Sequence, residues 1–222
     1  MTSWDPVWDE VYERQEWGQY PPEHVIRFVA RHWYGVADRT AVKLLDLGCG
    51  VGACTWYMAR ERFCVSGIDG SSVAAQRTRN RLDAEGLAAD VRVGDFVSLP
   101  WPDLTFDGVI DNASIYSNRF AAAQQAVREV HRVLKPGGFF LSTTFTSATW
   151  GAGSGTEVEP GGFVDIPEGP LQGKGFSLCL SRTQVERLYG AFDSVSIERF
   201  SWTTDEMAHV NEQWIATCRR AA

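Results

Sequence analysis

Apolar runs and amphipathic segments alternate along most of the chain. Short apolar runs bounded by turn residues are typical of strands that are buried on both faces. The segments between them repeat their apolar positions at spacings of three and four, as in Phe120, Ala123, Val127 and Val130, which is typical of amphipathic helices. Strands and helices that alternate in this way predict a parallel sheet covered by helices. The runs that we interpret as strands are 42–47, 63–69, 91–96, 106–111 and 139–145.

The first apolar run leads into a turn built from glycines. Glycine lets the backbone curl tightly and lets a ligand approach where any Cβ would clash. A helix is expected over 53–62, and its first turn would point unpaired N–H groups and the positive end of the helix dipole at a bound ligand. The sequence therefore predicts a nucleotide-type pocket. The residues of this turn are Gly48, Cys49, Gly50, Val51 and Gly52.

An acid inside the first strand indicates which nucleotide binds there. Asp46 precedes the turn, where its charge would repel a pyrophosphate but would suit an ammonium or a sulfonium. The glycine spacing also departs from the Gly-x-Gly-x-x-Gly of dinucleotide sites, which disfavours a nicotinamide oxidoreductase. Asp-x-Gly-x-Gly-x-Gly after a strand resembles the first motif of class I S-adenosylmethionine-dependent methyltransferases of the small-molecule type. The resemblance implies S-adenosyl-L-methionine as the cofactor.

The second strand also ends in an acid. Asp69 lies 17 positions after Gly52, close to the separation of about twenty at which an acid takes the ribose hydroxyls in nucleotide-binding α/β folds. Gly70 and Ser71 follow directly, and we expect both to contact the cofactor. The serine is also a candidate cap for the next helix.

Later marks agree with the same resemblance. In the family, an acid after the third strand accepts a hydrogen bond from the adenine amino group and the next residue lies against the ring; Asp95 and Phe96 occupy these positions. Asp111 ends the fourth strand, at the edge of the sheet where ligands bind in open α/β folds. Residues 133–138, Val-Leu-Lys-Pro-Gly-Gly, are another mark of this class.

The resemblance implies a Rossmann-like α/β fold, with a seven-stranded, mostly parallel sheet, one antiparallel strand and helices on both faces. A chain of 222 residues suits one such domain, and we divide it into four parts. These are an N-terminal helical cap (1–40), a cofactor-binding core (41–146), a glycine-rich insertion or lid (147–177), and a C-terminal helix with a strand hairpin (178–222).

The cap and the insertion are expected to choose the methyl acceptor. Tyr12, Trp17 and Tyr20 in the cap are candidates for the pocket wall, although packing on the sheet edge would also explain aromatic residues there. Residues 147–175 contain eight glycines and three prolines, and loops of such length are usually functional or mobile. A lid would exclude water from the reacting groups.

No pattern in the sequence identifies a catalytic base. Asn112 and Tyr116, just after the fourth strand, are placed to hold an acceptor. If the acceptor is a hydroxyl, a base helps to remove its proton, and His32 and His209 are the candidates. Both histidines are explained equally well as surface or packing residues, and His131 is interpreted as structural.

Charge and composition narrow the partners and the location. The net charge of −7 and the pI near 5.1 argue against nucleic acid as a partner, and we interpret Arg77, Arg79 and Arg81 as a solvated helix face. Five scattered cysteines without metal-ligand spacing indicate reduced thiols and no metal site. No signal peptide or membrane-spanning run is found, so we expect a cytoplasmic protein with no membrane partner. The oligomeric state stays open.

These observations predict transfer of a methyl group from S-adenosylmethionine to a small-molecule acceptor, a hydroxyl or amine of a natural-product or sugar-type metabolite. Two alternatives remain at this point. One is a protein or RNA methyltransferase, which would need a neutral or acidic contact surface or one local basic patch. The other is a catalytically silent S-adenosylmethionine-binding partner protein.

Overall fold

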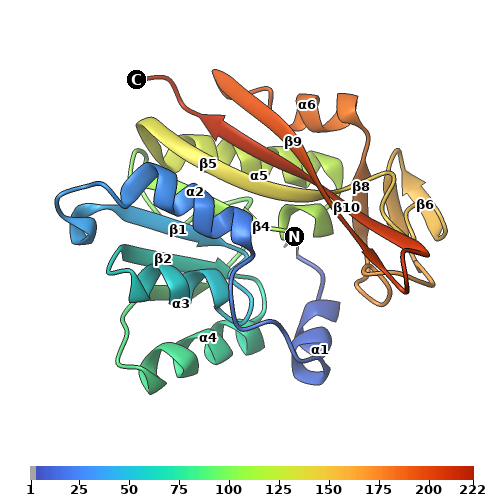
Figure 1. The fold of residues 1–222 in the computed structure, drawn as a ribbon, viewed down its shortest axis with the longest axis horizontal. Helices are drawn as coiled ribbons and strands as arrows, with labels where there is room; N and C mark the ends of the chain where they lie inside the picture. Colours follow the sequence, from blue (N-terminus) through green and yellow to red (C-terminus); the bar gives the residue numbers. More distant parts are fainter. Residues whose placement is uncertain (1–3) are drawn as a thin grey trace.

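A twisted sheet runs through the centre of residues 4–222, the part of the chain that the computed structural model describes (Figure 1). Seven strands lie in the order β3-β2-β1-β4-β5-β10-β9. All neighbours among the first five are parallel, and β10 is antiparallel to both β5 and β9. The predicted sheet with one antiparallel strand is therefore confirmed. The strands are β1 (Lys43–Leu47), β2 (Cys64–Asp69), β3 (Asp90–Val93), β4 (Phe106–Asn112), β5 (Leu134–Thr146), β9 (Ser194–Thr204) and β10 (His209–Arg219).

Three further strands lie within the glycine-rich segment and at its C-terminal end, where we had expected an irregular loop. β6 (Thr156–Glu159) and β7 (Gly162–Val164) form an antiparallel pair. β8 (Ser177–Leu180) joins β7 to the end of β5. Strands of three or four residues among glycines and acids carry too little alternation to be recognised in a sequence, so the strand count exceeds the predicted seven.

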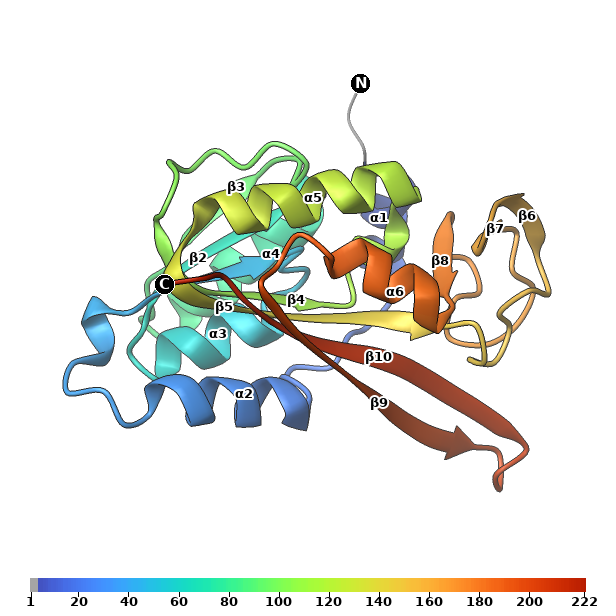
Figure 2. The ribbon, with the colours of Figure 1, turned by 90° about the horizontal axis from the view of Figure 1, so that it is seen from above.

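Helices cover both faces of the sheet, as Figure 2 shows for α2 and α3 on one side and α5 and α6 on the other. Successive residues of a strand face opposite sides. Leu45 accordingly packs in the cluster with α5 and α6, while Leu44 packs with α2 and α3. No helix within residues 4–222 is long and apolar enough to cross a membrane. The helices are α1 (Val7–Arg14), α2 (Glu23–Trp33), α3 (Ala53–Arg60), α4 (Ser72–Ala84), α5 (Phe120–Val133) and α6 (Arg182–Tyr189), with short 3₁₀ turns η1 (Arg39–Ala41) and η2 (Ile115–Ser117).

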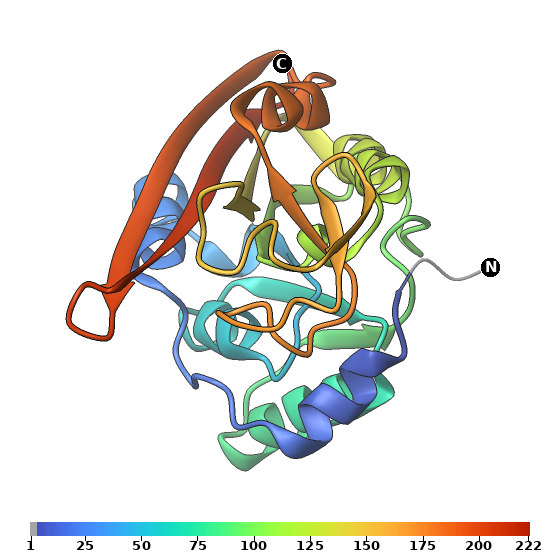
Figure 3. The same cartoon turned by 90° about the vertical axis from the view of Figure 1, so that its right-hand side faces the viewer.

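The N-terminal segment crosses the sheet edge beside α4, where Figure 3 shows α1 lying next to that helix. Arg77 donates to the Tyr12 carbonyl oxygen at 2.5 Å, and Arg81 donates to the carbonyl of Gln19. Arg79 donates at 2.7 Å to the carbonyl of Val91 on β3. The interpretation of these arginines as a solvated face is therefore wrong, because two of them tether the N-terminal segment. A helix pattern alone does not reveal partners that are distant in sequence.

Candidate active site

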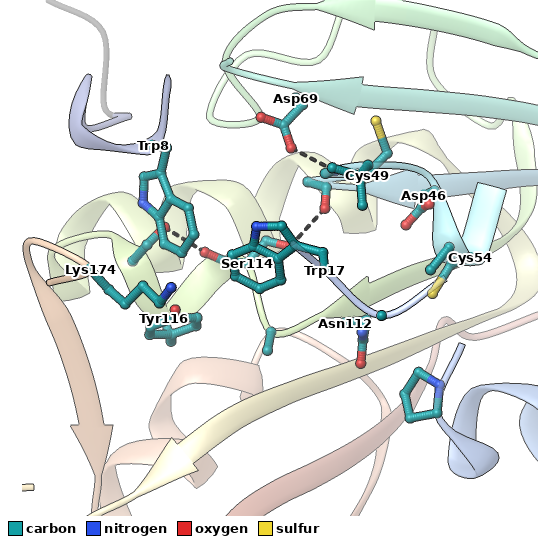
Figure 4. A pocket seen from close by; sticks show the side chains of 18 of the residues that line it. Trp8, Trp17, Asp46, Cys49, Cys54, Asp69, Asn112, Ser114, Tyr116 and Lys174 are labelled. Carbon is teal, nitrogen blue, oxygen red and sulfur yellow. Dashed lines mark hydrogen bonds between the residues drawn. The ribbon is translucent and has the colours of Figure 1, made fainter. Parts of the chain in front are cut away.

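The carboxyl ends of the central strands and the N-terminal segment enclose a pocket of about 630 Å³, a size typical of small-molecule sites. Figure 4 shows its interior. Residues from the N-terminal segment, the glycine turn, the loop after β4, the insertion and the β9–β10 hairpin contribute to its wall. They include Trp4, Trp8, Tyr12, Gln15, Trp17, Tyr20, His24, Asp46, Gly48, Cys49, Gly50, Asp69, Gly70, Phe96, Asn112, Ser114, Tyr116, Lys174, Phe200 and Trp202.

The glycine turn adopts a backbone that other residues resist. Gly48, Gly50 and Gly52 have φ values of +69°, +52° and +85°, in the left-handed region that favours glycine. A Cβ on Gly48 would lie 2.2 Å from Ser114 Oγ. Gly48, Gly50 and the intervening Cys49 line the pocket. Gly52 does not; it caps α3 and packs against Thr78, where a Cβ would lie 2.8 Å from the methyl carbon.

Asp69 stands at the end of β2 with its carboxylate held in place. Its two oxygens accept hydrogen bonds from the backbone N–H groups of Gly50 at 2.8 Å and Ser71 at 2.9 Å. Burial raises the pKa of Asp69 to about 6, although these hydrogen bonds oppose the shift. Each carboxylate oxygen keeps lone-pair capacity, and the residue lines the pocket. The arrangement suits a ligand with two neighbouring hydroxyls.

The residues after Asp69 serve the pocket differently. Gly70 lines it, and a Cβ there would come within 2.5 Å of Trp4 Cγ. Ser71 is not part of the lining. Its hydroxyl accepts from Ala74 N–H at the start of α4 and donates to Asp9 of α1 at 2.5 Å. Ser71 therefore anchors the N-terminal helix to the cofactor-binding core.

Asp46 and Asp111 are both buried acids, but only Asp46 lines the pocket. Asp46 accepts a hydrogen bond from Thr55 Oγ1 at 2.6 Å, and burial raises its pKa to about 7. Asp111 accepts from Ser142 Oγ at 2.5 Å and from Ser114 N–H at 2.8 Å. Its carboxylate therefore holds the loop after β4 in shape, instead of reaching the pocket as we expected.

β3 ends at Val93, whereas the sequence predicted a strand to residue 96, so Asp95 and Phe96 lie in the loop after the strand. Phe96 is buried and lines the pocket. Asp95 is not part of the lining, and its Oδ1 accepts from the Val97 N–H at 3.1 Å. Of this expected pair, the aromatic residue alone reaches the pocket.

Two of the four residues expected to hold or deprotonate the acceptor line the pocket. Asn112 and Tyr116 do, and the Tyr116 ring packs edge-on against Phe145 at 4.8 Å between centroids. His32 does not, because its imidazole stacks on Phe139 at 3.9 Å, outside the pocket. His209 is also outside, stacked on the Trp150 ring at 3.8 Å. Neither of these histidines is placed to act as a base.

A histidine that the sequence analysis missed lies in the wall. His24 is the second residue of α2, and its Nε2 is buried without a hydrogen-bond partner among the described residues. Burial lowers the pKa of His24, and the nearby Asn112 side chain partly opposes that shift. The imidazole is therefore mainly neutral at pH 7 and able to accept a proton. In the sequence, Pro-Pro-Glu-His indicates only a helix start.

Aromatic rings from the N-terminal segment form the outer wall. Tyr12, Trp17 and Tyr20 all line the pocket, together with Trp8, which we had not singled out. The Tyr12 and Trp17 ring centroids lie 5.4 Å apart, and those of Trp8 and Trp17 lie 6.2 Å apart. Rings at these separations form one packed cluster. The cluster faces the glycine turn, and a Cβ on Gly50 would lie 3.0 Å from the Tyr12 hydroxyl.

A family model described as a methyltransferase domain matches residues 44–138, which include the glycine turn, Asp69 and Asn112. The chain carries a class I methyltransferase domain. S-Adenosylmethionine is the cofactor of this family, and the residues of the site fit it. Asp69 offers a carboxylate for two hydroxyls, and the glycine turn allows the cofactor to approach closely. A bound cation would favour the ionised form of Asp46. The expectation drawn from the Asp-x-Gly-x-Gly-x-Gly motif is confirmed.

Known proteins similar to this methyltransferase domain are named for different methyl acceptors. A sterol 24-C-methyltransferase of Neurospora crassa is 29% identical over 59% of this chain and 38% of its own length. A fatty-acid O-methyltransferase of Mycolicibacterium smegmatis is 36% identical over 48% of this chain and 38% of its own. The chain thus spans about two fifths of the length of these relatives.

Solved structures extend the likeness to the whole fold. A structure from work on the conversion of a disulfide bond into a thioacetal group during echinomycin biosynthesis has a TM-score of 0.66. It shares 20% sequence identity, and the match covers 97% of this chain and 92% of that one. Identity at this level shows a common fold and not a common acceptor.

Cofactor affinity should depend on pH because two carboxyl groups that line the pocket have pKa values near neutrality. Asp46 and Asp69 have pKa values raised to about 7 and about 6. A bound cation would favour the ionised form of Asp46, and hydroxyl donors would favour that of Asp69, so below these pKa values binding must release protons and is weakened. We expect S-adenosylmethionine to bind about tenfold more tightly at pH 7.5 than at pH 5.5.

Calorimetric titrations at the two pH values measure this dependence. Asp46→Asn should flatten it between pH 6 and pH 7.5, because Asn carries no titratable proton. An affinity of the unmodified protein that does not change with pH would contradict the electrostatic role assigned to these acids.

Proposed function

We propose that this chain transfers the methyl group of S-adenosylmethionine to a small organic acceptor held in the aromatic pocket. The observation that carries the proposal is the enclosure of the site by the Trp8, Tyr12 and Trp17 rings. Apolar walls with a few fixed polar groups are typical of sites for small organic molecules. A polymer would need an open groove.

The chain's own residues have distinct tasks in this reaction. The cofactor supplies an electrophilic methyl group on a sulfonium sulfur. Asp69 binds the ribose hydroxyls, and the glycine turn accommodates the cofactor's close approach. The aromatic wall excludes water, which would compete with the acceptor. Alignment of the two reactants can supply about 7–11 kcal/mol of the barrier.

The acceptor in this proposal is a hydroxyl or an amine of a natural-product or sugar-type metabolite. Asn112, the last residue of β4, and Tyr116, in the η2 turn, hold it. For a hydroxyl acceptor, the oxygen would receive the methyl group and His24 would take up the hydroxyl proton. Its Nε2 is buried without a hydrogen-bond partner among the described residues, and the Asn112 side chain lies near the ring. The relatives that methylate sterols and fatty acids also support a small organic acceptor.

The two alternatives, an RNA methyltransferase and a catalytically silent partner protein, have less support in the structure. RNA would need a basic patch, yet Arg77 and Arg81 of α4 donate to the N-terminal backbone. A catalytically silent partner protein would bind the cofactor and turn over no acceptor. A pocket with a histidine nitrogen available inside it favours an active enzyme.

An acceptor screen tests the proposal. The full chain is incubated with S-adenosylmethionine and separate pools of small hydroxyl and amine compounds, peptides and RNA, and S-adenosylhomocysteine formation is followed with mass spectrometry of each pool. We expect methylated products only in a small-molecule pool. Products confined to peptide or RNA, or cofactor binding without turnover in any pool, would contradict it. For an active hydroxyl acceptor, His24→Ala should lower turnover with little change in cofactor affinity.

A further inference from the structure

One lysine lies inside the pocket wall instead of on the surface. Lys174, from the glycine-rich insertion, is only 7% exposed and lines the pocket. Its ammonium donates to Gln15 Oε1 and lies 4.6 Å from the centre of the Trp17 ring and 5.9 Å from that of Trp8. Within residues 4–222 no carboxylate comes within ion-pair distance of it.

A buried ammonium without an anion is unfavourable. Burial of a charge costs free energy unless a counter-ion and hydrogen bonds compensate, and burial lowers the pKa of Lys174 accordingly. One amide oxygen and the faces of two rings provide only part of that compensation, because an ammonium has three N–H donors. The position therefore calls for an anion that belongs to a ligand.

Two more donors in the same wall lack acceptors. The indole Nε1 atoms of Trp8 and Trp17 are buried, and neither has a hydrogen-bond partner among the described residues. Buried indole N–H groups normally find an acceptor. Both rings contact the Lys174 ammonium, so three donor-bearing side chains share one part of the pocket.

Acidic and basic side chains lie on different sides of the pocket. Figure 4 places Lys174 on the side opposite Asp46 and Cys54. The buried acids that face the pocket, Asp46 and Asp69, belong to the cofactor-binding core. The sulfonium and ammonium groups of the cofactor are complementary to that acidic side, and the donor-rich side suits an anion on the acceptor.

We propose that the methyl acceptor carries a carboxylate, which pairs with Lys174 and accepts hydrogen bonds from the indole N–H groups of Trp8 and Trp17. This inference rests on the proposed function and narrows its acceptor to small organic acids. Lys174 is then a residue that selects the acceptor and takes no part in binding the cofactor.

Matched pairs of ligands test the inference on the full chain saturated with S-adenosylhomocysteine. The probes are benzoate, phenylacetate, 4-phenylbutyrate and octanoate, each compared with its primary amide by ligand-detected NMR titration. We expect at least one acid to bind about tenfold more tightly than its amide. Lys174→Met should remove that preference, whereas Lys43→Met, which removes an exposed lysine outside the pocket, should retain it.

Two controls distinguish failure of this inference from failure of the proposed function. S-Adenosylhomocysteine should bind Lys174→Met within twofold of the unmodified protein, and the melting temperature of this variant should be equal or higher, because an uncompensated buried charge is removed. A tenfold loss of S-adenosylhomocysteine affinity would overturn the inference by assigning Lys174 to the cofactor. Absence of any acid preference, including no binding of either member of every pair, would also overturn it. Failure of the unmodified protein to bind S-adenosylhomocysteine would instead refute the proposed function.

Discussion

Removal of residues 1–20 should abolish methyl transfer and weaken cofactor binding at least tenfold while leaving a folded protein. The segment contributes Trp8, Tyr12 and Trp17 to the pocket wall, so its loss admits water to the reacting groups. The fold should survive because α1 contains no buried residue, and the buried members of both apolar clusters begin at Val25.

Circular dichroism and thermal unfolding check the fold of the truncated protein, and titration with S-adenosylhomocysteine measures its affinity. A milder version keeps the full chain and replaces Arg77 and Arg81 with Met, which removes the side chains that donate to the Tyr12 and Gln19 carbonyls. We expect this double variant to lie between the truncated and unmodified proteins in cofactor affinity. Full activity after truncation would show that the N-terminal segment is not a functional lid.

Asp69→Ala should weaken S-adenosylhomocysteine binding by about tenfold to a hundredfold. The two ribose hydroxyls would lose their carboxylate partner, and an unpaired polar group costs about 1–3 kcal/mol. The melting temperature should fall as well, because the carboxylate also accepts from the backbone N–H groups of Gly50 and Ser71. Calorimetry and thermal unfolding measure the two effects separately.

A second aspartate provides a matched control. Asp107 accepts from the Lys43 N–H at 2.8 Å and pairs with Lys135 at 2.8 Å, outside the pocket. Asp107→Ala therefore also removes an acceptor of a backbone N–H and should lower the melting temperature without changing cofactor affinity. Equal affinities of the two variants would mean that Asp69 does not bind the cofactor.

The cofactor side of the site could be predicted because its residues act through local backbone geometry. Gly48 and Gly50 are needed where the chain turns out of β1, and Asp69 stands at the end of the next strand. Such features follow from short motifs and strand ends, which the sequence displays directly. The alternation of strands and helices predicted the parallel part of the sheet for the same reason.

Two residues on the acceptor side could not be predicted, because they meet their neighbours only in the folded chain. His24 follows two prolines at a helix start, and Lys174 lies in a glycine-rich stretch, so neither belongs to a periodic pattern or a motif. Their proximity to Asn112 and Trp17 depends on long-range packing. Conversely, Asp111 lies at a strand end, where a ligand-binding residue is expected, but its carboxylate accepts from the backbone N–H groups of Ser114 and Ile115 in the following loop.

Calorimetric titration of the unmodified chain with S-adenosylhomocysteine and with NAD tests the central claim most directly. The claim is that the pocket between the glycine turn and the N-terminal aromatic residues is built for S-adenosylmethionine. We expect one S-adenosylhomocysteine to bind per chain and NAD to show no binding, because Asp46 and the glycine spacing do not suit a pyrophosphate. Binding of NAD with no binding of S-adenosylhomocysteine would contradict the account.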